Sequence, residues 1–478
     1  MSESATMLRR QPDPVKTLSR FLILPVENQV RELDSKLFFA CVAAQRGFSS
    51  MIGSRGEVDF RLGQIPRGIY IAKSMTPRSK KVFRILQLLG HELVGWDEEA
   101  VNTFALPEVY YSRRLSARTL RAVQHLFAWG EADAELFRNY PDYPGTPIHI
   151  TGNPRGDLLR PELRPFYAAK ADRCRRKHGD FVLINTNFSH VNAYYPVLNL
   201  LVPGKGKGLA KIGRAAIGMS REYAEGRAAH KHRVFAAFQK LVPFLHDAFP
   251  NLTVVIRPHP IENPTVYHAL AERYPRVHVE KDSDNPIPWL IAARALVHCS
   301  CTTGVESWLT VTPTIAYRPD PSTRYEEPLP NALSHSCFEL DQVAETLDRI
   351  LNDKLGRLEG ETQHRLIAHH LEGLSGPLAS ERIVTVLERI IDAGGDRPAP
   401  TRRERLEGRA RGVRRRAWKF LKSQLKGSKN RPEFQRYRYP GLEPDDLAER
   451  IAHFQQILGH EQPIRVTRMA DHVYRLDP

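Results

Sequence analysis

Short apolar segments recur along this chain, and each is followed by polar residues and then by a helical pattern. They lie at 21–25, 51–53, 68–72, 92–96, 126–130, 148–150, 181–185, 252–256, 295–298 and 313–317. Strands that are apolar on both faces are typical of parallel sheets with helices on both sides. The alternation therefore predicts an α/β fold, because successive parallel strands need a crossover between them.

The series divides near residue 150, where Thr151-Gly152-Asn153-Pro154-Arg155 reads as a turn. At about 100–200 residues per domain, a chain of 478 residues holds more than one domain. We expect a loose arm over 1–19, Rossmann-like domains over 20–150 and 151–395, and a basic helical extension over 396–478. Helices are expected at 37–44, 78–88, 231–248, 340–354 and 360–393, with 203–230 irregular.

The net charge of +16 is concentrated near the C-terminus. Residues 402–431 contain 13 Lys and Arg against two acidic residues, which leaves +11 in that segment and +5 elsewhere. A near-neutral body does not favour nucleic-acid binding. Basic residues interspersed with large apolar ones indicate a helix that lies on an anionic membrane, here with Arg414, Arg415, Arg416, Trp418, Lys419 and Lys422. The alternatives are a solvated basic helix, a helix packed on the body or a nucleic-acid contact.

The five cysteines are scattered and indicate no disulfide framework, so a reducing cytoplasm is the simpler interpretation. The N-terminus does not have the apolar core of a signal peptide, and no run of about 18 apolar residues suits a membrane span. Cys299 and Cys301 have no second pair at metal-ligand spacing, so no metal is predicted.

Ligands bind beyond the carboxyl ends of strands in open parallel sheets, so the loops after strands are the places to search. One such loop is Arg257-Pro258-His259-Pro260, after the strand 252–256. Its prolines stiffen the backbone, and its arginine and histidine are suited to phosphate oxygens. The alternative is a rigid loop whose histidine bonds only to the backbone.

A second loop, 299–306, follows the strand 295–298 and contains Ser300, Thr302, Thr303, Gly304 and Glu306. Hydroxyls and free backbone N–H groups before a helix bind phosphate well. Glu306 is then placed to accept bonds from sugar hydroxyls. An ordinary capping box would give the same pattern.

Acidic residues follow two strands of the first domain. Asp97, Glu98 and Glu99 come after the strand 92–96, and Glu27 comes after 21–25. A carboxylate at a strand end can act as a general base in the cleft. The alternative in both places is a polar helix start. The dinucleotide fingerprint Gly-x-Gly-x-x-Gly is absent.

The segments FLILPVENQVRELDSK, VGWDEE, ITGNPRGD, IRPHP and HCSCTTGVES, in that order, resemble the bacterial surface carbohydrate biosynthesis proteins. More widely they look like the GT-B enzymes of capsule, lipopolysaccharide and teichoic-acid assembly, among them Kdo transferases and CDP-glycerol glycerophosphotransferases. The resemblance covers roughly residues 20–330. It implies a GT-B-like fold of two domains facing a cleft, and transfer of a sugar from a nucleotide donor without a cofactor or metal.

The resemblance also assigns roles to residues. His259 and Pro260 match the His-Pro motif that contacts the nucleotide of CMP-sugars, and Ser300, Thr302 and Thr303 match a hydroxyl motif near the donor phosphate. Glu306 matches the acid that follows. Glu98 and Glu99 resemble the two acids of a motif that holds the catalytic base, and Glu98 is the expected base. The third residue of that motif is Gly, where this chain has Ala100, so Asp97 or Glu27 could serve as the base instead. Arg155 is expected to reach the cleft from the interdomain connection.

We therefore expect a glycosyltransferase that uses a nucleotide sugar, with a CMP-sugar favoured, and a glycan or lipid-linked acceptor. It would act in the cytoplasm, at the inner face of the membrane. A CDP-alcohol phosphotransferase, a sugar-nucleotide epimerase and a non-catalytic scaffold are the alternatives. By analogy with GT-B folds, residues 437–442 and a helix over 444–458 are expected to pack across both domains.

Overall fold

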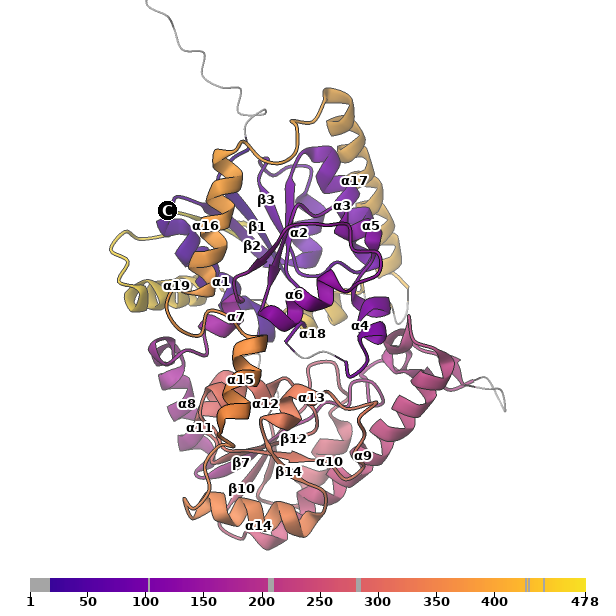
Figure 1. Cartoon of the computed structure of the whole chain (residues 1–478), viewed down its shortest axis with the longest axis vertical. Helices are drawn as coiled ribbons and strands as arrows, with labels where there is room; N and C mark the ends of the chain where they lie inside the picture. Colours follow the sequence, from indigo (N-terminus) through magenta and orange to yellow (C-terminus); the bar gives the residue numbers. More distant parts are fainter. Residues whose placement is uncertain are drawn as a thin grey trace, which may run out of the picture.

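The computed structural model of this protein describes residues 18–101, 104–204, 210–280, 285–425, 428, 430–441 and 443–478, with the side chain of Tyr437 left aside. Two α/β domains lie end to end, each built on its own sheet (Figure 1). The fold class expected from the sequence, two parallel-sheet domains in a GT-B-like arrangement with a helical C-terminal region, is confirmed. The first 17 residues of the expected arm, and residues 426, 427 and 429 of the basic segment, lie outside the described residues.

The first domain contains an eight-stranded sheet in the order β15-β16-β2-β1-β3-β4-β5-β6. Its parallel strands are β1 (Phe21–Val26), β2 (Ser49–Ser54), β3 (Ile69–Ala72), β4 (Glu92–Gly95), β5 (His125–Ala128) and β6 (Ile148–Ile150). Separate hydrophobic clusters cover the two faces of this sheet. This burial on both sides explains why the strands are apolar throughout.

Helices connect and cover these strands. They are α1 (Gln29–Gln45), α2 (Arg55–Arg61), α3 (Lys80–Leu89), α4 (Pro107–Arg114), α5 (Ala117–Leu120) and α6 (Glu131–Arg138). The sequence predicted α1 only over 37–44, and the helix begins at Gln29. The polar first turns of α1 are buried by pairing with other polar groups, which a search for apolar periodicity does not detect.

The second domain contains a six-stranded parallel sheet in the order β11-β10-β7-β12-β13-β14. Its strands are β7 (Phe181–Asn185), β10 (Thr253–Arg257), β11 (Val277–Val279), β12 (Ala295–His298), β13 (Thr314–Tyr317) and β14 (His335–Cys337). Its helices are α8 (Pro165–His178), α9 (Arg221–Ala248), α10 (Thr265–Arg273), α11 (Ile287–Ala292), α12 (Thr303–Leu309), α13 (Pro328–Ala332) and α14 (Leu340–Leu351). A small ribbon pairs β8 (Leu201–Val202) with β9 (Lys211–Ile212). The expectation that 203–230 is irregular was wrong for 221–230, because α9 begins at Arg221, where Ser220 caps it.

The connection between the domains is held from two directions. The short helix α7 (Pro154–Asp157) follows β6, and Gly152 before it has φ +82. A Cβ at Gly152 would lie 2.2 Å from the carbonyl oxygen of Glu372, so only glycine fits where the chain crosses back. The helix expected over 360–393 is divided into α15 (Glu361–His370) and α16 (Ala379–Asp392), and α16 packs on α1 of the first domain.

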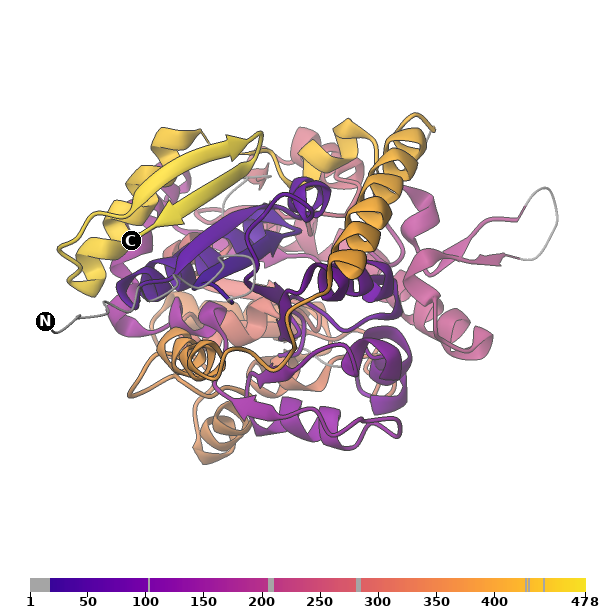
Figure 2. The same cartoon turned by 90° about the horizontal axis from the view of Figure 1, so that it is seen from above.

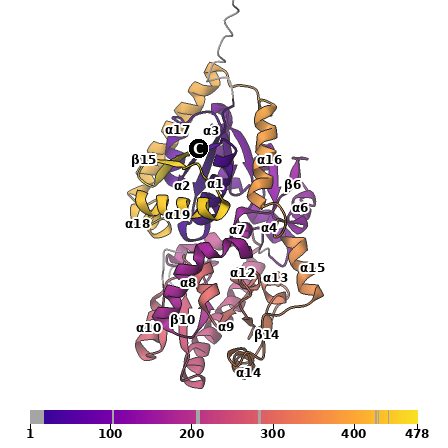
Figure 3. The same ribbon diagram turned by 90° about the vertical axis from the view of Figure 1, so that its left-hand side faces the viewer.

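The C-terminal region returns to the first domain. It contains α17 (Arg402–Ser423), α18 (Pro432–Arg438) and α19 (Pro444–Leu458). Contacts of α19 with both α1 and α8 place it across the two domains, and Figure 3 shows it at their junction, whereas Leu442 lies outside the described residues.

The last residues add an antiparallel pair, β15 (Arg465–Ala470) and β16 (Val473–Asp477), to the edge of the first sheet beside β2 (Figure 2). The sequence predicted only helices in this extension. The preference for strands here comes from the open edge of β2, which pairs with β16. No helix in the described part of the chain is long and apolar enough to cross a membrane.

Candidate functional site

The three acids after β4 have different surroundings. Arg114 donates from Nε to Asp97 Oδ2 at 2.8 Å, and the Tyr110 hydroxyl donates to the same oxygen at 3.0 Å. Glu98 is 2% exposed and accepts from Trp96 Nε1 at 2.7 Å. The side chain of Glu99, by contrast, is 45% exposed. Of the three carboxylates, only Glu99 is open to a substrate.

Glu98 belongs to a buried ion-pair network at the carboxyl ends of β1 and β3. Lys36 Nζ lies 3.0 Å from Glu98 Oε1 and 2.9 Å from Glu32 Oε2, and donates to the carbonyl oxygen of Pro25 at 2.8 Å. Lys73 Nζ joins the network at 2.7 Å from Glu32 Oε1. These pairs explain why so many polar residues could be buried in α1.

Glu27, the alternative base, is surrounded by cations. Arg55, Lys73 and Arg438 place nitrogens 2.9, 3.0 and 2.8 Å from its carboxylate oxygens. Burial raises the pKa of Glu27, but Lys73, Arg438 and Arg55 together outweigh it and hold the pKa well below the usual range. A carboxylate so strongly stabilised in its charged form is a weak base.

Arg31, on the first turn of α1, pairs with Glu99 at 3.6 Å between Nη1 and Oε2. Burial raises the pKa of Glu99, but the charges of Arg31, Arg114 and Arg155 lower it by more. The carboxylate is therefore ionised near pH 7. After Glu99, the charge of Glu306, which belongs to the second domain, also raises the pKa of Arg31. Arg31 therefore stands where the two domains meet.

His259 lies in the loop after β10, opposite this pair. Its Nδ1 accepts the backbone N–H of Ile261 at 3.3 Å, so the neutral ring carries its proton on Nε2. Burial lowers the pKa of His259 to about 4, with Arg31 as a further cause. The ring is thus a neutral hydrogen-bond donor at pH 7. Arg257 is 9% exposed and lies 5.3 Å over the Trp289 ring, and Pro260 completes the turn.

The loop after β12 is held in an unusual conformation. Ser300 has φ 47, a left-handed value that L-residues seldom adopt. A residue held in this conformation typically costs about 1–3 kcal/mol of folding free energy. Asn331 Nδ2 donates to Ser300 Oγ at 3.1 Å, and Asn187 Nδ2 donates to its carbonyl oxygen at 3.2 Å. A Cβ at Gly304 would lie 2.6 Å from His298 Nε2, so glycine lets α12 start close to the strand. Thr302 is buried and Thr303 is partly exposed at this helix start.

Arg155 joins the first domain to Glu306 of the second. Arg155 Nη2 donates to Glu306 Oε1 at 2.6 Å and Nη1 donates to the carbonyl oxygen of Glu98 at 3.0 Å. Arg31, Arg155, Glu306 and Asn285 line an enclosed pocket of about 10 Å³, which is room for about one water. The cleft is closed at this point, so a substrate needs the domains to separate here.

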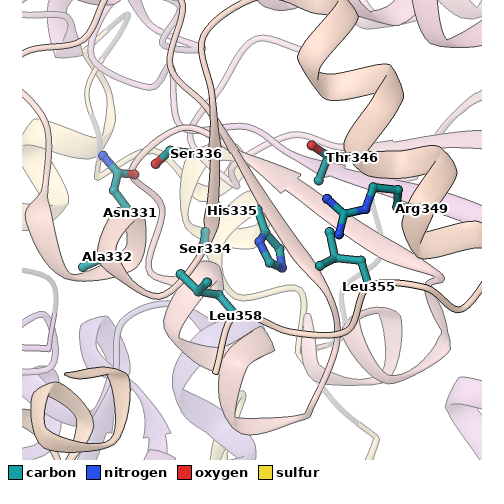
Figure 4. Close-up of a pocket in the computed structure, with 9 residues that line it drawn as sticks. All are labelled: Asn331, Ala332, Ser334, His335, Ser336, Thr346, Arg349, Leu355 and Leu358. Atoms are coloured by element: carbon teal, nitrogen blue, oxygen red, sulfur yellow. The ribbon is translucent and has the colours of Figure 1, made fainter. Parts of the chain in front are cut away.

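A larger open pocket of about 490 Å³ lies at the outer edge of the second sheet (Figure 4). It is lined by Asn331, Ala332, Ser334, His335, Ser336, Thr346, Arg349, Leu355 and Leu358. None of the residues singled out from the sequence lines it. Its connection to the cleft is indirect, through Asn331, which bonds to Ser300.

The sequence analysis missed Arg31, Lys36 and the loop after β7. That loop contains Asn187 and His190, and the order of strands places β7 between β10 and β12. The polar run Asn185-Thr186-Asn187 directly after an apolar strand was a usable signal. Across the residues that the structure describes, no three His, Cys, Asp or Glu side chains are arranged to hold a metal ion.

The six residues expected to bind a membrane lie on two faces of α17. Arg415 Nη2 and Lys419 Nζ turn inward to Asp59 of α2, at 2.8 and 3.5 Å. Arg416 lies 5.9 Å from the Phe60 ring. Trp418 is 58% exposed and carries Lys422 over its ring at 5.0 Å. Arg414 is also exposed, so the predicted set is only partly available to a membrane.

No protein-family model matches this chain, and no curated protein matches it in sequence. Among solved structures, the wall teichoic acid polymerase TagF is 11% identical at a TM-score of 0.47, covering 80% of this chain and 91% of that one. HepE of Anabaena, solved with UDP-glucose, is 14% identical at a TM-score of 0.38, and the match covers 78% of this chain and 98% of HepE. The UDP-GlcNAc 2-epimerase of Methanocaldococcus jannaschii, solved with UDP-GlcNAc and UDP, is 11% identical at 0.44, covering 77% and 99%. At these identities the likeness concerns the layout of the domains alone.

Proposed function

We propose that this protein is a glycosyltransferase of surface-polysaccharide or glycolipid assembly that uses a nucleotide-activated sugar. One observation carries the proposal. The half-exposed carboxylate of Glu99 and its partner Arg31, from the first domain, stand against His259 and the 300–304 loop of the second. A base on one side of a cleft and phosphate-binding groups on the other are what transfer to an acceptor hydroxyl requires.

Each group has a role in the transfer. Glu99 takes the proton of the acceptor hydroxyl while the acceptor oxygen forms a bond to the anomeric carbon of the donor. The bond from that carbon to the phosphate oxygen breaks, and negative charge develops on the leaving nucleotide. His259 Nε2–H, the Thr302 and Thr303 hydroxyls and the Arg31 guanidinium meet this charge. When Arg31 turns to the phosphate, Glu99 loses the largest of its counter-charges, so its pKa rises and it becomes a stronger base.

Closure of the cleft gives the order of events. The ion pair between Arg155 and Glu306 holds the domains together with room for about one water between them. Substrates therefore enter an open form, and closure afterwards excludes the water that would hydrolyse the donor. We expect replacement of Arg155 to raise the ratio of donor hydrolysis to transfer.

A thermal-shift panel with CMP, CDP, UDP, GDP and ADP, each with Mg²⁺ or EDTA, tests the donor site. A ligand that binds the folded state raises the melting temperature. We expect one nucleotide to do so, with CMP favoured, and His259→Ala to abolish the shift. His268→Ala is the matched control, because His268 is exposed on the next helix, α10. CDP as the sole ligand would point to an alcohol phosphate as the transferred group.

The absence of a shift with every nucleotide would contradict the proposal and favour a scaffold. The product then decides between reaction classes. A glycosidic bond in the product supports the glycosyltransferase, a phosphodiester supports the CDP-alcohol phosphotransferase, and an inverted free nucleotide sugar supports the epimerase.

We also propose that α17 holds the protein at an anionic membrane from the cytoplasmic side. Its inner face is fixed to α2 by Asp59. Its outer side exposes Leu406, Val413, Trp418, Phe420 and Leu421, each more than half exposed. Exposed apolar residues among uncompensated cations are complementary to anionic lipid headgroups and the acyl boundary beneath them.

Vesicle co-sedimentation tests this surface. We expect binding to vesicles containing phosphatidylglycerol and none to pure phosphatidylcholine at the same salt concentration. The double variant Arg414→Gln with Lys422→Gln should weaken binding about 30-fold, at about 1 kcal/mol per basic residue. Lys240→Gln, an exposed lysine on α9, is the matched control. Equal binding of the double variant and wild type would overturn this assignment.

A further inference from the structure

Four nitrogen-bearing side chains gather between α4 of the first domain and α9 of the second. Arg113 lies in the last turn of α4, Arg227 and Lys231 lie one turn apart on α9, and His190 lies in the loop after β7. The guanidinium groups of Arg113 and Arg227 lie 5.2 and 5.0 Å from the centre of one ring, that of Phe104. Cations from both domains are therefore held at the same place.

Two of the four side chains are buried, whereas Arg113 and His190 are partly exposed. Arg227 is 1% and Lys231 is 2% exposed. His190 lies among them: burial lowers its pKa well below the usual value, and the charges of Arg227, Arg113 and Lys231 lower it further. Burial together with the neighbouring Arg227 also lowers the pKa of Arg113 to about 10. These side chains repel one another in a region with little solvent screening.

Acidic residues near the cluster do not balance it. Glu327 forms an ion pair with Arg227, and Asp97 is paired with Arg114. The Lys231 ammonium forms no hydrogen bond and no ion pair with any residue that the structure describes. The side chain of Arg113 bonds only weakly, to the Met219 sulfur at 3.9 Å. Glu327 also acts on Lys231, so Arg227 and Lys231 share one carboxylate, and Arg113 forms no ion pair with any residue that the structure describes.

A buried ammonium that shares its counter-charge with a second cation is unfavourable, because it has lost its hydration and gained only part of a counter-charge. Such an arrangement is stable in a folded protein when a ligand supplies the missing charge. A tetrahedral dianion fits this cluster, because it can accept from two guanidinium groups, an ammonium and a neutral imidazole together.

We propose that Arg113, His190, Arg227 and Lys231 form a phosphate-binding site that closes between the two domains when a substrate phosphate enters. The site adjoins the proposed donor site through the loop after β7, which contains His190. In that loop Thr186 Oγ1 accepts the His259 backbone N–H at 3.3 Å, and Asn187 Nδ2 donates to the Ser300 carbonyl oxygen at 3.2 Å. The phosphate belongs either to the donor nucleotide or to a phosphorylated acceptor. Only this choice of source rests on the proposed function.

Titration with inorganic phosphate, followed by calorimetry and by melting temperature, tests the site. We expect phosphate to bind wild type and to raise its melting temperature beyond the effect of chloride at equal ionic strength. Lys231→Met should bind phosphate at least ten-fold more weakly. Without phosphate, it should melt at a higher temperature than wild type, because a buried charge that is only partly compensated is gone. Lys240→Met, exposed on the same helix, is the matched control and should behave as wild type.

Equal phosphate affinity in wild type and Lys231→Met, or no phosphate-specific effect in wild type, would overturn the proposal. If Lys231→Met does not fold, Arg113→Gln replaces it, since Arg113 is only partly buried. Displacement of phosphate by nucleoside diphosphates identifies the donor as its source. Phosphate binding alongside a saturating nucleotide identifies the acceptor. This test uses inorganic phosphate and a variant at Lys231, whereas the test of the proposed function uses nucleotides and His259→Ala. A negative result in one test is therefore distinguishable from a negative result in the other.

Discussion

Replacing Glu98 and Glu99 separately by glutamine should divide stability from chemistry. Glu98→Gln removes the charge that faces Lys36 at 3.0 Å, while Lys36 keeps Glu32 at 2.9 Å and the Pro25 carbonyl at 2.8 Å. The loss is therefore that of one hydrogen bond between charged groups, about 1.5–3 kcal/mol. At about 2–4 °C per kcal/mol for a domain of 150–250 residues, the first unfolding transition should fall by roughly 3–12 °C.

Glu99→Gln is the matched comparison, one residue away. Its carboxylate is 45% exposed and pairs with Arg31 at 3.6 Å, so its removal should cost less than about 1 kcal/mol. Transfer should fall about 10²–10⁴-fold, the usual contribution of a general base. The measurements are differential scanning calorimetry and the rate of sugar transfer with the donor found by the nucleotide panel. Unchanged melting with lost transfer in Glu98→Gln, or near-wild-type transfer in Glu99→Gln, would refute these roles.

Three further predictions follow from other buried groups. Burial raises the pKa of Glu262 from 4.5 to about 7. As the pH rises between these values, Glu262 ionises in the unfolded chain but stays protonated in the folded one, so the free energy of unfolding of wild type falls by up to about 3 kcal/mol. Glu262→Gln should therefore gain stability relative to wild type from pH 4.5 to 7 in urea unfolding, and a constant difference would contradict this. Asp59→Asn should loosen the part of α17 that contains Arg415 and Lys419, while α3 still holds the rest of the helix; proteolysis at residues 414–422 would report this, with protection equal to wild type as the opposing result. Arg155→Ala should cost about 3–5 kcal/mol because it leaves Glu306 buried and unpaired; a change in melting below 1 °C would exclude that role.

The central strands and their loops could be predicted from the sequence, because a strand buried on both faces must be apolar and its end must be polar. The edge strands β11 and β14 were not predicted, because His278, His335 and Ser336 interrupt their apolar pattern. The polar start of α1 could not, since Glu32, Lys36 and Lys73 satisfy one another only after β1, β3 and β4 are side by side. The same holds for the base. The sequence does not distinguish three consecutive acidic residues from one another. Their exposure differs in the structure because Arg114 pairs with Asp97 and Lys36 pairs with Glu98, which leaves Glu99 the most exposed.

The sequence by itself determined the α/β alternation, the division near residue 150, the basic C-terminal segment and the loops that bear the phosphate-binding types of side chain. These are properties of composition and spacing over a few residues. Tertiary structure alone decided which acid stays open, how Arg155 closes the cleft on Glu306, that β16 pairs with β2, and that Arg113 meets Arg227 and Lys231. Each of these depends on residues far apart in the chain, because burial and charge are set by neighbours that only the folded backbone brings together.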